Sequence, residues 1–186
     1  TICKRYKGNQ AHAEYLEQMA GKFFDLLQKY HGLGERERLL LRLAAILHDC
    51  GKFISMSAPG ECAYQIIMST EILGISHMER EMVACIVRYN TMELPNFREF
   101  DGKLGNDEYL IVMKLAAILR VCNALDRSHR QKFADMKLTI KDSNIVITTA
   151  YPDNITLEKK TLKDKQDFFE EVYGLGFEIK QKKKKQ

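Results

Sequence analysis

An imidazole and a carboxylate stand side by side at His48 and Asp49, inside the segment LHDCGK. The dipeptide alone is common, but an apolar stretch precedes it and Gly51-Lys52 follows it, so we expect it at the end of a buried helix. Neighbouring helical residues project about 100° apart, so both side chains can reach one ion there. These ligands suit Mg²⁺, Mn²⁺ or a transition metal, which would polarise a phosphoryl oxygen and activate water.

Further ligands are expected from other helices. His12 lies near the start of the first predicted helix, and its alternative role is that of an ordinary hydrogen-bonded or exposed histidine. A third group should come from a later helix, where Asn123 and Asp126 are the candidates. Asp126 has an alternative role in a surface ion pair with a nearby arginine.

The elements that position these residues are mostly helices. Apolar spacing predicts helices over residues 9–30, 35–49, 61–73, 77–90 and 107–128. Ser76 is expected to cap the fourth helix, with Glu79 as its capping-box partner.

The pattern changes near residue 130. A hairpin over 137–140 and 145–149, a helix over 161–173 and a strand over 175–179 are predicted. We therefore expect a mainly α protein: an HD-domain-like helical bundle over 1–130, a small α+β appendage over 131–181 and a basic tail over 182–186.

Composition narrows the function classes. The chain has 29 basic and 25 acidic residues, and Lys180 and Lys182–Lys185 supply five of the positive charges, so the body is not a general nucleic-acid binder. The lysine run is either a solvated tail or a polyanion-binding segment. No apolar run reaches the roughly 18 residues that span a bilayer, and no signal peptide is recognisable. Five cysteines without a CxxC motif predict reduced thiols and a cytoplasmic protein.

Several basic residues lie within or beside the apolar helices and could line a phosphate-binding groove. The candidates are Arg42, Lys52, Arg88, Arg120 and Arg127. Arginine binds phosphate in a bidentate manner. Arg42, Arg88 and Arg120 stand out because they lie within apolar helices, where an unpaired charge is unfavourable. For each residue the alternative is a solvated helix face.

In combination, these motifs resemble the HD superfamily of metal-dependent phosphohydrolases. More closely, the chain resembles the C-terminal region of the exopolyphosphatase / guanosine pentaphosphate phosphohydrolase family. The resemblance rests on QAHAEYLEQMAGKFFDLL around His12, LLLRLAAILHDCGKFIS at 39–55, CAYQIIMSTEILGISHMEREMVACIVRYN at 62–90 and KLAAILRVCNALDRSHRQ at 114–131. It implies N-terminal actin-like catalytic domains in the parent chain, and a helical region that extends a polyphosphate channel and supports a homodimer.

The chain departs from the HD pattern at three positions. Glu61 and Asn90 stand where the pattern has histidines, and Asn123 stands where it has the closing aspartate. A two-metal site is therefore not expected. A one-ion site using His12, His48, Asp49 and Asn123 or Asp126 is one hypothesis; the other is a metal-free structural pair inherited from an ancestral enzyme.

Three functions follow. The first is a non-catalytic domain of an exopolyphosphatase, binding polyphosphate or another phosphate-rich anion and aiding dimerisation. The second is a self-sufficient metal-dependent HD phosphohydrolase acting on a nucleotide or phosphate ester. The third is an interaction module without an anion site. We favour the first, with no catalytic residue in this domain.

Overall fold

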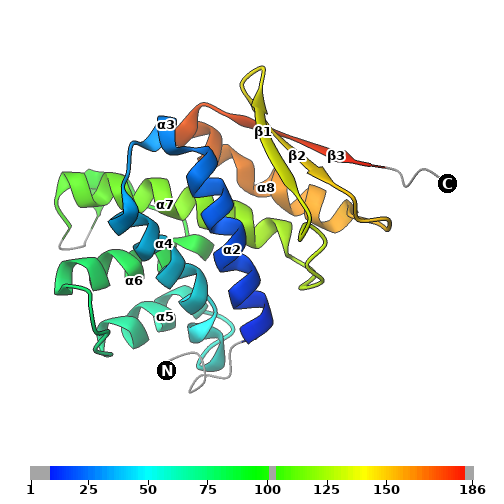
Figure 1. The fold of residues 1–186 in the computed structure, drawn as a ribbon. Helices are drawn as coiled ribbons and strands as arrows, with labels where there is room; N and C mark the ends of the chain where they lie inside the picture. Colours follow the sequence, from blue (N-terminus) through cyan, green and yellow to red (C-terminus); the bar gives the residue numbers. More distant parts are fainter. Residues whose placement is uncertain (1–8, 101–103, 183–186) are drawn as a thin grey trace.

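The computed structural model of the protein describes residues 9–100 and 104–182, which form a helical body and a small sheet (Figure 1). The helices are α2 (Gln10–Leu26), α3 (Gln28–His31), α4 (Glu35–Leu47), α5 (Pro59–Met68), α6 (His77–Thr91), α7 (Asn106–Leu125) and α8 (Thr156–Tyr173), with short 3₁₀ turns η1 (Cys50–Phe53) and η2 (Phe97–Glu99). The strands are β1 (Lys137–Lys141), β2 (Asn144–Thr149) and β3 (Gly176–Gln181). The predicted mainly α class with a small C-terminal appendage is confirmed.

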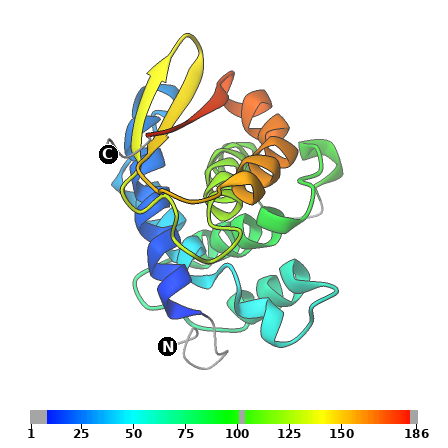
Figure 2. The ribbon, with the colours of Figure 1, turned by 90° about the vertical axis from the view of Figure 1, so that its right-hand side faces the viewer.

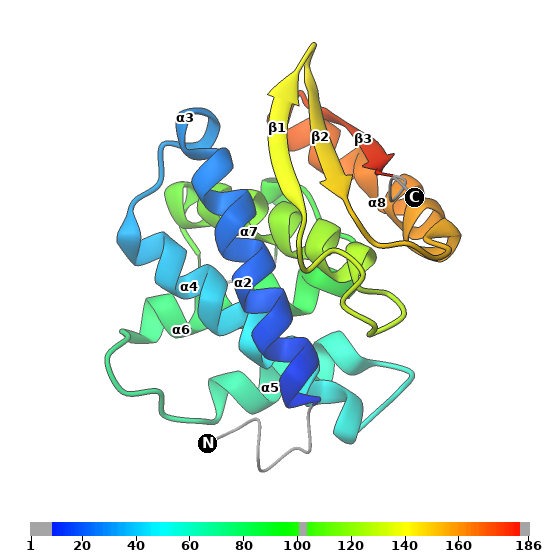
Figure 3. The same ribbon diagram turned by 45° about the vertical axis from the view of Figure 1, so that its right-hand side comes forward.

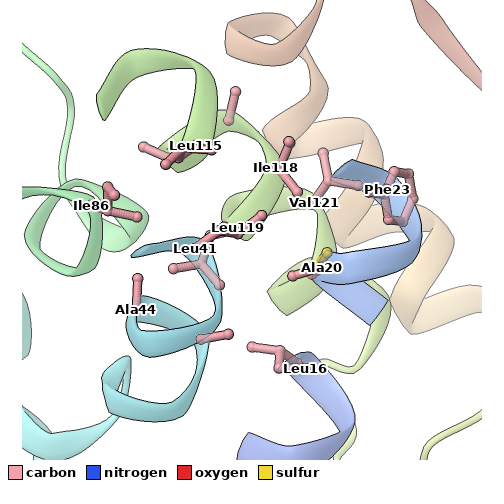
Figure 4. Close-up of a cluster of buried hydrophobic side chains, with 14 of the residues drawn as sticks. Leu16, Ala20, Phe23, Leu41, Ala44, Ile86, Leu115, Ile118, Leu119 and Val121 are labelled. Atoms are coloured by element: carbon pink, nitrogen blue, oxygen red, sulfur yellow. The ribbon is translucent and has the colours of Figure 1, made fainter. Parts of the chain in front are cut away.

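Helix α7 lies at the centre of the helical body. It is apolar around most of its circumference, which is typical of a helix buried on several sides. Its residues Leu115 and Leu119 belong to a buried cluster with Leu16 of α2, Leu41 of α4 and Ile86 of α6 (Figure 4). Figure 2 looks roughly along α7 and shows α2 on one side of it and α8 on the other. This packing fixes the ends of α2, α4 and α7 relative to one another.

The C-terminal appendage is a β-hairpin followed by a helix and a third strand. Asp142 and Ser143 form the turn, and both have positive φ, as two-residue hairpin turns require. Strand β3 pairs parallel to β2, and α8 makes the crossover between them (Figure 3). Phe177 of β3 contacts Phe23 of α2, with ring centroids 6.4 Å apart. The appendage therefore shares the core of the helical body, and the boundary near residue 130 stays a prediction.

Several elements differ from the expected bounds: the helix predicted over 9–30 is divided into α2 and α3, and α4 and α7 end earlier than predicted. Two of the larger differences, in α5 and α8, have local reasons. Helix α5 ends at Met68 because the hydroxyl groups of Ser69 and Thr70 donate to carbonyl oxygens one turn earlier. Helix α8 begins at Thr156, five residues before the predicted start, and directly after a turn in which the Asn154 side chain accepts from the Thr156 amide at 2.6 Å.

Other expectations concern thiols, membranes and the tail. Cys62, Cys85 and Cys122 carry free thiols, as expected, and Cys3 lies outside the described residues. Within the described part of the chain, each helix is too short or too polar to cross a bilayer. The basic tail lies, apart from Lys182, outside the described residues.

The start of α6 yields a prediction about stability. The Ser76 side chain accepts from the Glu79 amide, and the Glu79 carboxylate accepts from the Ser76 amide at 2.7 Å, so the predicted capping box is confirmed. Replacing Ser76 by alanine should lower the free energy of unfolding by about 1 kcal/mol, measured by urea denaturation. Ser57→Ala, in a surface loop, is the control. Equal midpoints for the two variants would contradict the role of the cap.

Candidate functional site

Three helix ends meet at the predicted chemical centre. Asn9 caps α2, its side chain accepting from the amide of His12, which places His12 in the first turn. His48 is the C-cap residue immediately after α4, and Asp126 is the C-cap residue immediately after α7. The side chains of His12, His48 and Asp126 are all buried. Residues from distant parts of the sequence therefore share one interior site.

Asp126 holds His12 in a fixed orientation. Nδ1 of His12 donates to Oδ2 of Asp126 at 2.6 Å, and the amide of Gln131 donates to Oδ1 of the same carboxylate at 2.8 Å. Both carboxylate oxygens thus accept a hydrogen bond. Because Nδ1 of His12 is directed at Asp126, the other ring nitrogen, Nε2, faces the interior of the site. The His129 ring stacks on His12 with centroids 3.8 Å apart.

His48 directs the lone pair of its Nε2 at the same interior position that Nε2 of His12 faces. Its Nδ1 lies 2.7 Å from the carbonyl oxygen of Ala45, and because a carbonyl only accepts, Nδ1 carries the proton. Burial lowers the pKa of His48 to about 4, so the ring is neutral near pH 7 and Nε2 is unprotonated. Nε2 of His48 lies 3.1 Å from Nε2 of His12.

Asp49 completes the group. Its Oδ1 is 3.1 Å from Nε2 of His48 and 2.7 Å from Nζ of Lys52. Burial by itself would raise the pKa of Asp49, but His48 and Lys52 together hold it below its usual value. The ligand atoms of His12, His48 and Asp49 lie within 4.8 Å of one another. Two imidazole nitrogens and a carboxylate oxygen therefore converge on one point, which is a donor set that suits a divalent cation.

The two alternative ligands occupy different places. Asp126 lies behind His12 and contacts its Nδ1, so it acts on this group through the imidazole. Asn123 lines a separate cavity. Glu61, at another altered position of the HD pattern, pairs with Arg88 at 2.8 Å. Stacking by His129 could not be predicted from the sequence, because its contact with His12 depends on the turn that follows α7.

That cavity has a volume of about 360 Å³ and lies between α6, α7 and α8. Its lining consists of Asn90, Thr91, Arg120, Asn123, Ala124, Arg127, Thr161, Asp164 and Lys165. Asn90 is only 4% exposed, and neither polar atom of its side chain has a hydrogen-bond partner among the described residues. Arg127 and Lys165 are exposed. The cavity thus combines a buried carboxamide with cations at its rim.

The structure separates the predicted phosphate-binding residues. Arg42 pairs with Glu17, and Lys52 pairs with Asp49. Arg120 donates to the carbonyl oxygens of Tyr89 and Met92 and lies over the Phe168 ring. Of the five, only Arg120 and Arg127 line the cavity. Lys165 joins them, and the sequence did not indicate it because the packing of α8 on α7 is a tertiary feature.

A larger cavity of about 890 Å³ adjoins the first along α8. Its lining is acidic and contains Glu93, Glu99, Asp164, Asp167 and Glu171 against Arg120 and Lys165. An anion is therefore favoured in the smaller cavity over the larger one.

The family comparison agrees with this architecture. The family model described as Ppx/GppA phosphatase, domain III, matches residues 1–167. No curated protein matches the chain. The chain therefore belongs to the Ppx/GppA phosphatase domain III family and is a helical domain of an exopolyphosphatase-type phosphatase.

Proposed function

We propose that this domain binds a phosphate-rich anion, polyphosphate in particular, in the cavity between α6, α7 and α8. The observation that carries the proposal is the pair of exposed cations at its rim, Arg127 and Lys165. Neither forms a salt bridge within the part of the chain that the structure describes. Arg120 adds a third positive group, and Asp164 is the one acidic residue among the described residues of the lining. The cavity therefore has a positive balance that favours phosphate.

Removing the two rim cations tests the proposal. The double variant Arg127→Gln/Lys165→Gln should bind medium-chain polyphosphate at least about tenfold more weakly, because hydrogen bonds to charged groups contribute about 1.5–3 kcal/mol each. The remaining affinity should also depend less on salt, because fewer charges are screened. Calorimetric titration at two salt concentrations measures both effects.

The matched control is Arg36→Gln/Arg42→Gln, which removes the same net charge from two arginines that already pair with Glu79 and Glu17. It should leave polyphosphate affinity nearly unchanged. Equal losses in the two double variants would mean that net charge, and not this cavity, governs binding.

A second candidate function is metal binding at His12, His48 and Asp49. The specific observation is the convergence of two histidine nitrogens and one carboxylate oxygen, with His12 and His48 each oriented through its other nitrogen. A bound divalent ion would supply Lewis-acid chemistry towards a phosphoryl oxygen. Calorimetric titration with Mn²⁺ and Zn²⁺ tests this candidate, and the absence of binding by both ions would remove it, together with the self-sufficient HD phosphohydrolase.

The remaining expectations concern the parent protein. A domain III implies a parent chain with other domains, and we propose actin-like catalytic domains among them. Formation of a homodimer is likewise a proposal, and sedimentation of the purified chain tests it. A cytoplasmic location stays a prediction.

A further inference from the structure

We propose that the cavity between α6, α7 and α8 recognises the end of a phosphate chain, and that Asn90 forms a hydrogen bond with the hydroxyl group of the terminal phosphate. The inference rests on the proposed anion site and specifies which part of the anion enters it. It concerns the buried inner end of the cavity, here called the floor, where Asn90 lies. Attraction between charges does not account for an uncharged carboxamide at this position.

Asn90 is the residue that charge does not explain. It lies in the last turn of α6 and lines the cavity, and its side chain is buried with Nδ2 and Oδ1 both unpaired among the described residues. Buried polar atoms in folded proteins are nearly always hydrogen-bonded, because an unmade bond is unfavourable. A ligand that both donates to Oδ1 and accepts from Nδ2 would satisfy this carboxamide.

The carboxamide oxygen distinguishes between parts of a phosphate chain. A site built for fully ionised phosphate needs only donors, as arginine, lysine and backbone amides provide. An acceptor at the floor is unfavourable towards an ionised oxygen, but it bonds well to a P–OH group. Interior units of a polyphosphate have no hydroxyl group. A terminal unit has one below about pH 6, where its second ionisation occurs, and an acceptor such as Oδ1 favours retention of that proton at higher pH.

The arrangement by depth agrees with this assignment. Asn90 is buried and Asn123 is half-buried, whereas Arg127 and Lys165 are exposed at the rim. A chain that enters end first would place its protonatable terminus against the carboxamides and its ionised interior units against the cations. The carboxylate of Asp164, also exposed in the lining, disfavours additional negative charge and does not disfavour a hydroxyl group.

Two small phosphates test the inference on the 186-residue chain. Linear pyrophosphate consists only of ends, whereas cyclic trimetaphosphate has none, and near neutral pH the charge on pyrophosphate is no larger than that on the ring. Calorimetric titration should show pyrophosphate binding at least tenfold more tightly. Equal affinities would overturn recognition of the end and leave the anion site intact. Failure of both phosphates and of long polyphosphate to bind would overturn the proposed function as well.

Replacing Asn90 tests the residue itself. Asn90→Leu keeps the approximate shape and removes both polar atoms, so pyrophosphate affinity should fall at least tenfold while the thermal midpoint does not decrease. A merely structural role predicts the reverse: lower stability and unchanged binding. Asn90→Asp, which keeps an acceptor and removes the donor, should also lose pyrophosphate, whereas the same change at exposed Asn96 should not. Wild-type affinity in folded Asn90→Leu or Asn90→Asp would overturn the assignment.

Discussion

Replacing Gly51 by alanine should destabilise the domain by about 3 kcal/mol. A Cβ atom at this position would lie 1.9 Å from the carbonyl oxygen of Pro59 and 2.6 Å from the amide nitrogen of Ala63. Both atoms belong to the backbone of α5, so no side-chain rotation can relieve the overlap. Either η1 must move away from α5 or α5 must shift. Guanidinium denaturation monitored by circular dichroism measures the loss.

Gly32→Ala is the control for Gly51→Ala. Gly32 has a φ of 65°, but a Cβ atom there would meet nothing within 4 Å, so only backbone strain of about 1 kcal/mol is expected. If the two variants unfold at the same denaturant concentration, the close approach of η1 to α5 is not a determinant of stability. In that case the packing of η1 against α5 would not explain why Gly51, two residues after the His48-Asp49 pair, is a glycine.

Replacing Asp126 by asparagine should weaken Mn²⁺ binding about 10- to 100-fold, if the His12–His48–Asp49 group holds the ion as proposed. His12 and the amide of Gln131 both donate to Asp126. Asparagine has one oxygen and one amino group, so one of these N–H groups would face another donor. His12 would then lose the contact that fixes its orientation. Calorimetric titration measures the affinity, and the ¹⁵N shifts of His12 report its tautomer.

Three further variants test the same site and serve as controls for Asp126→Asn. His48→Gln should abolish Mn²⁺ binding, and Asp107→Asn, at the opposite end of α7, should leave it unchanged. Lys52→Gln should strengthen it, because the Lys52 ammonium group otherwise competes for Oδ1 of Asp49. Unchanged affinity in both Asp126→Asn and His48→Gln would show that Mn²⁺ binds elsewhere and that the histidine pair is structural.

Much of the helical fold could be predicted because its signals are local. The apolar spacing predicted the helices, and the Ser76 capping box fixed where α6 begins. The hairpin was also evident, although the parallel pairing of β3 with β2 was not, because it depends on how α8 crosses over.

The candidate site was only partly predictable, for a geometrical reason. His12, His48 and Asp49 were expected together, and the structure brings them together. The spacing could not decide between Asn123 and Asp126, which lie about one turn apart along α7. Because α7 ends at Leu125, Asp126 leaves the helix and contacts Nδ1 of His12, whereas Asn123 lines the separate cavity. The cavity requires α8 to pack beside α6 and α7, which no short sequence pattern encodes.

The contact between His12 and Asp126 joins residues separated by 114 positions. Closing so long a loop is entropically unfavourable until the intervening helices have docked, so the pair should form late in folding. Once formed, it ties the first helix of the bundle to the end of the central one, and α2 cannot detach locally without depriving the buried carboxylate of Asp126 of its imidazole partner. Any ion held there would bind only the fully assembled chain, so its binding would report completed folding and would oppose partial unfolding.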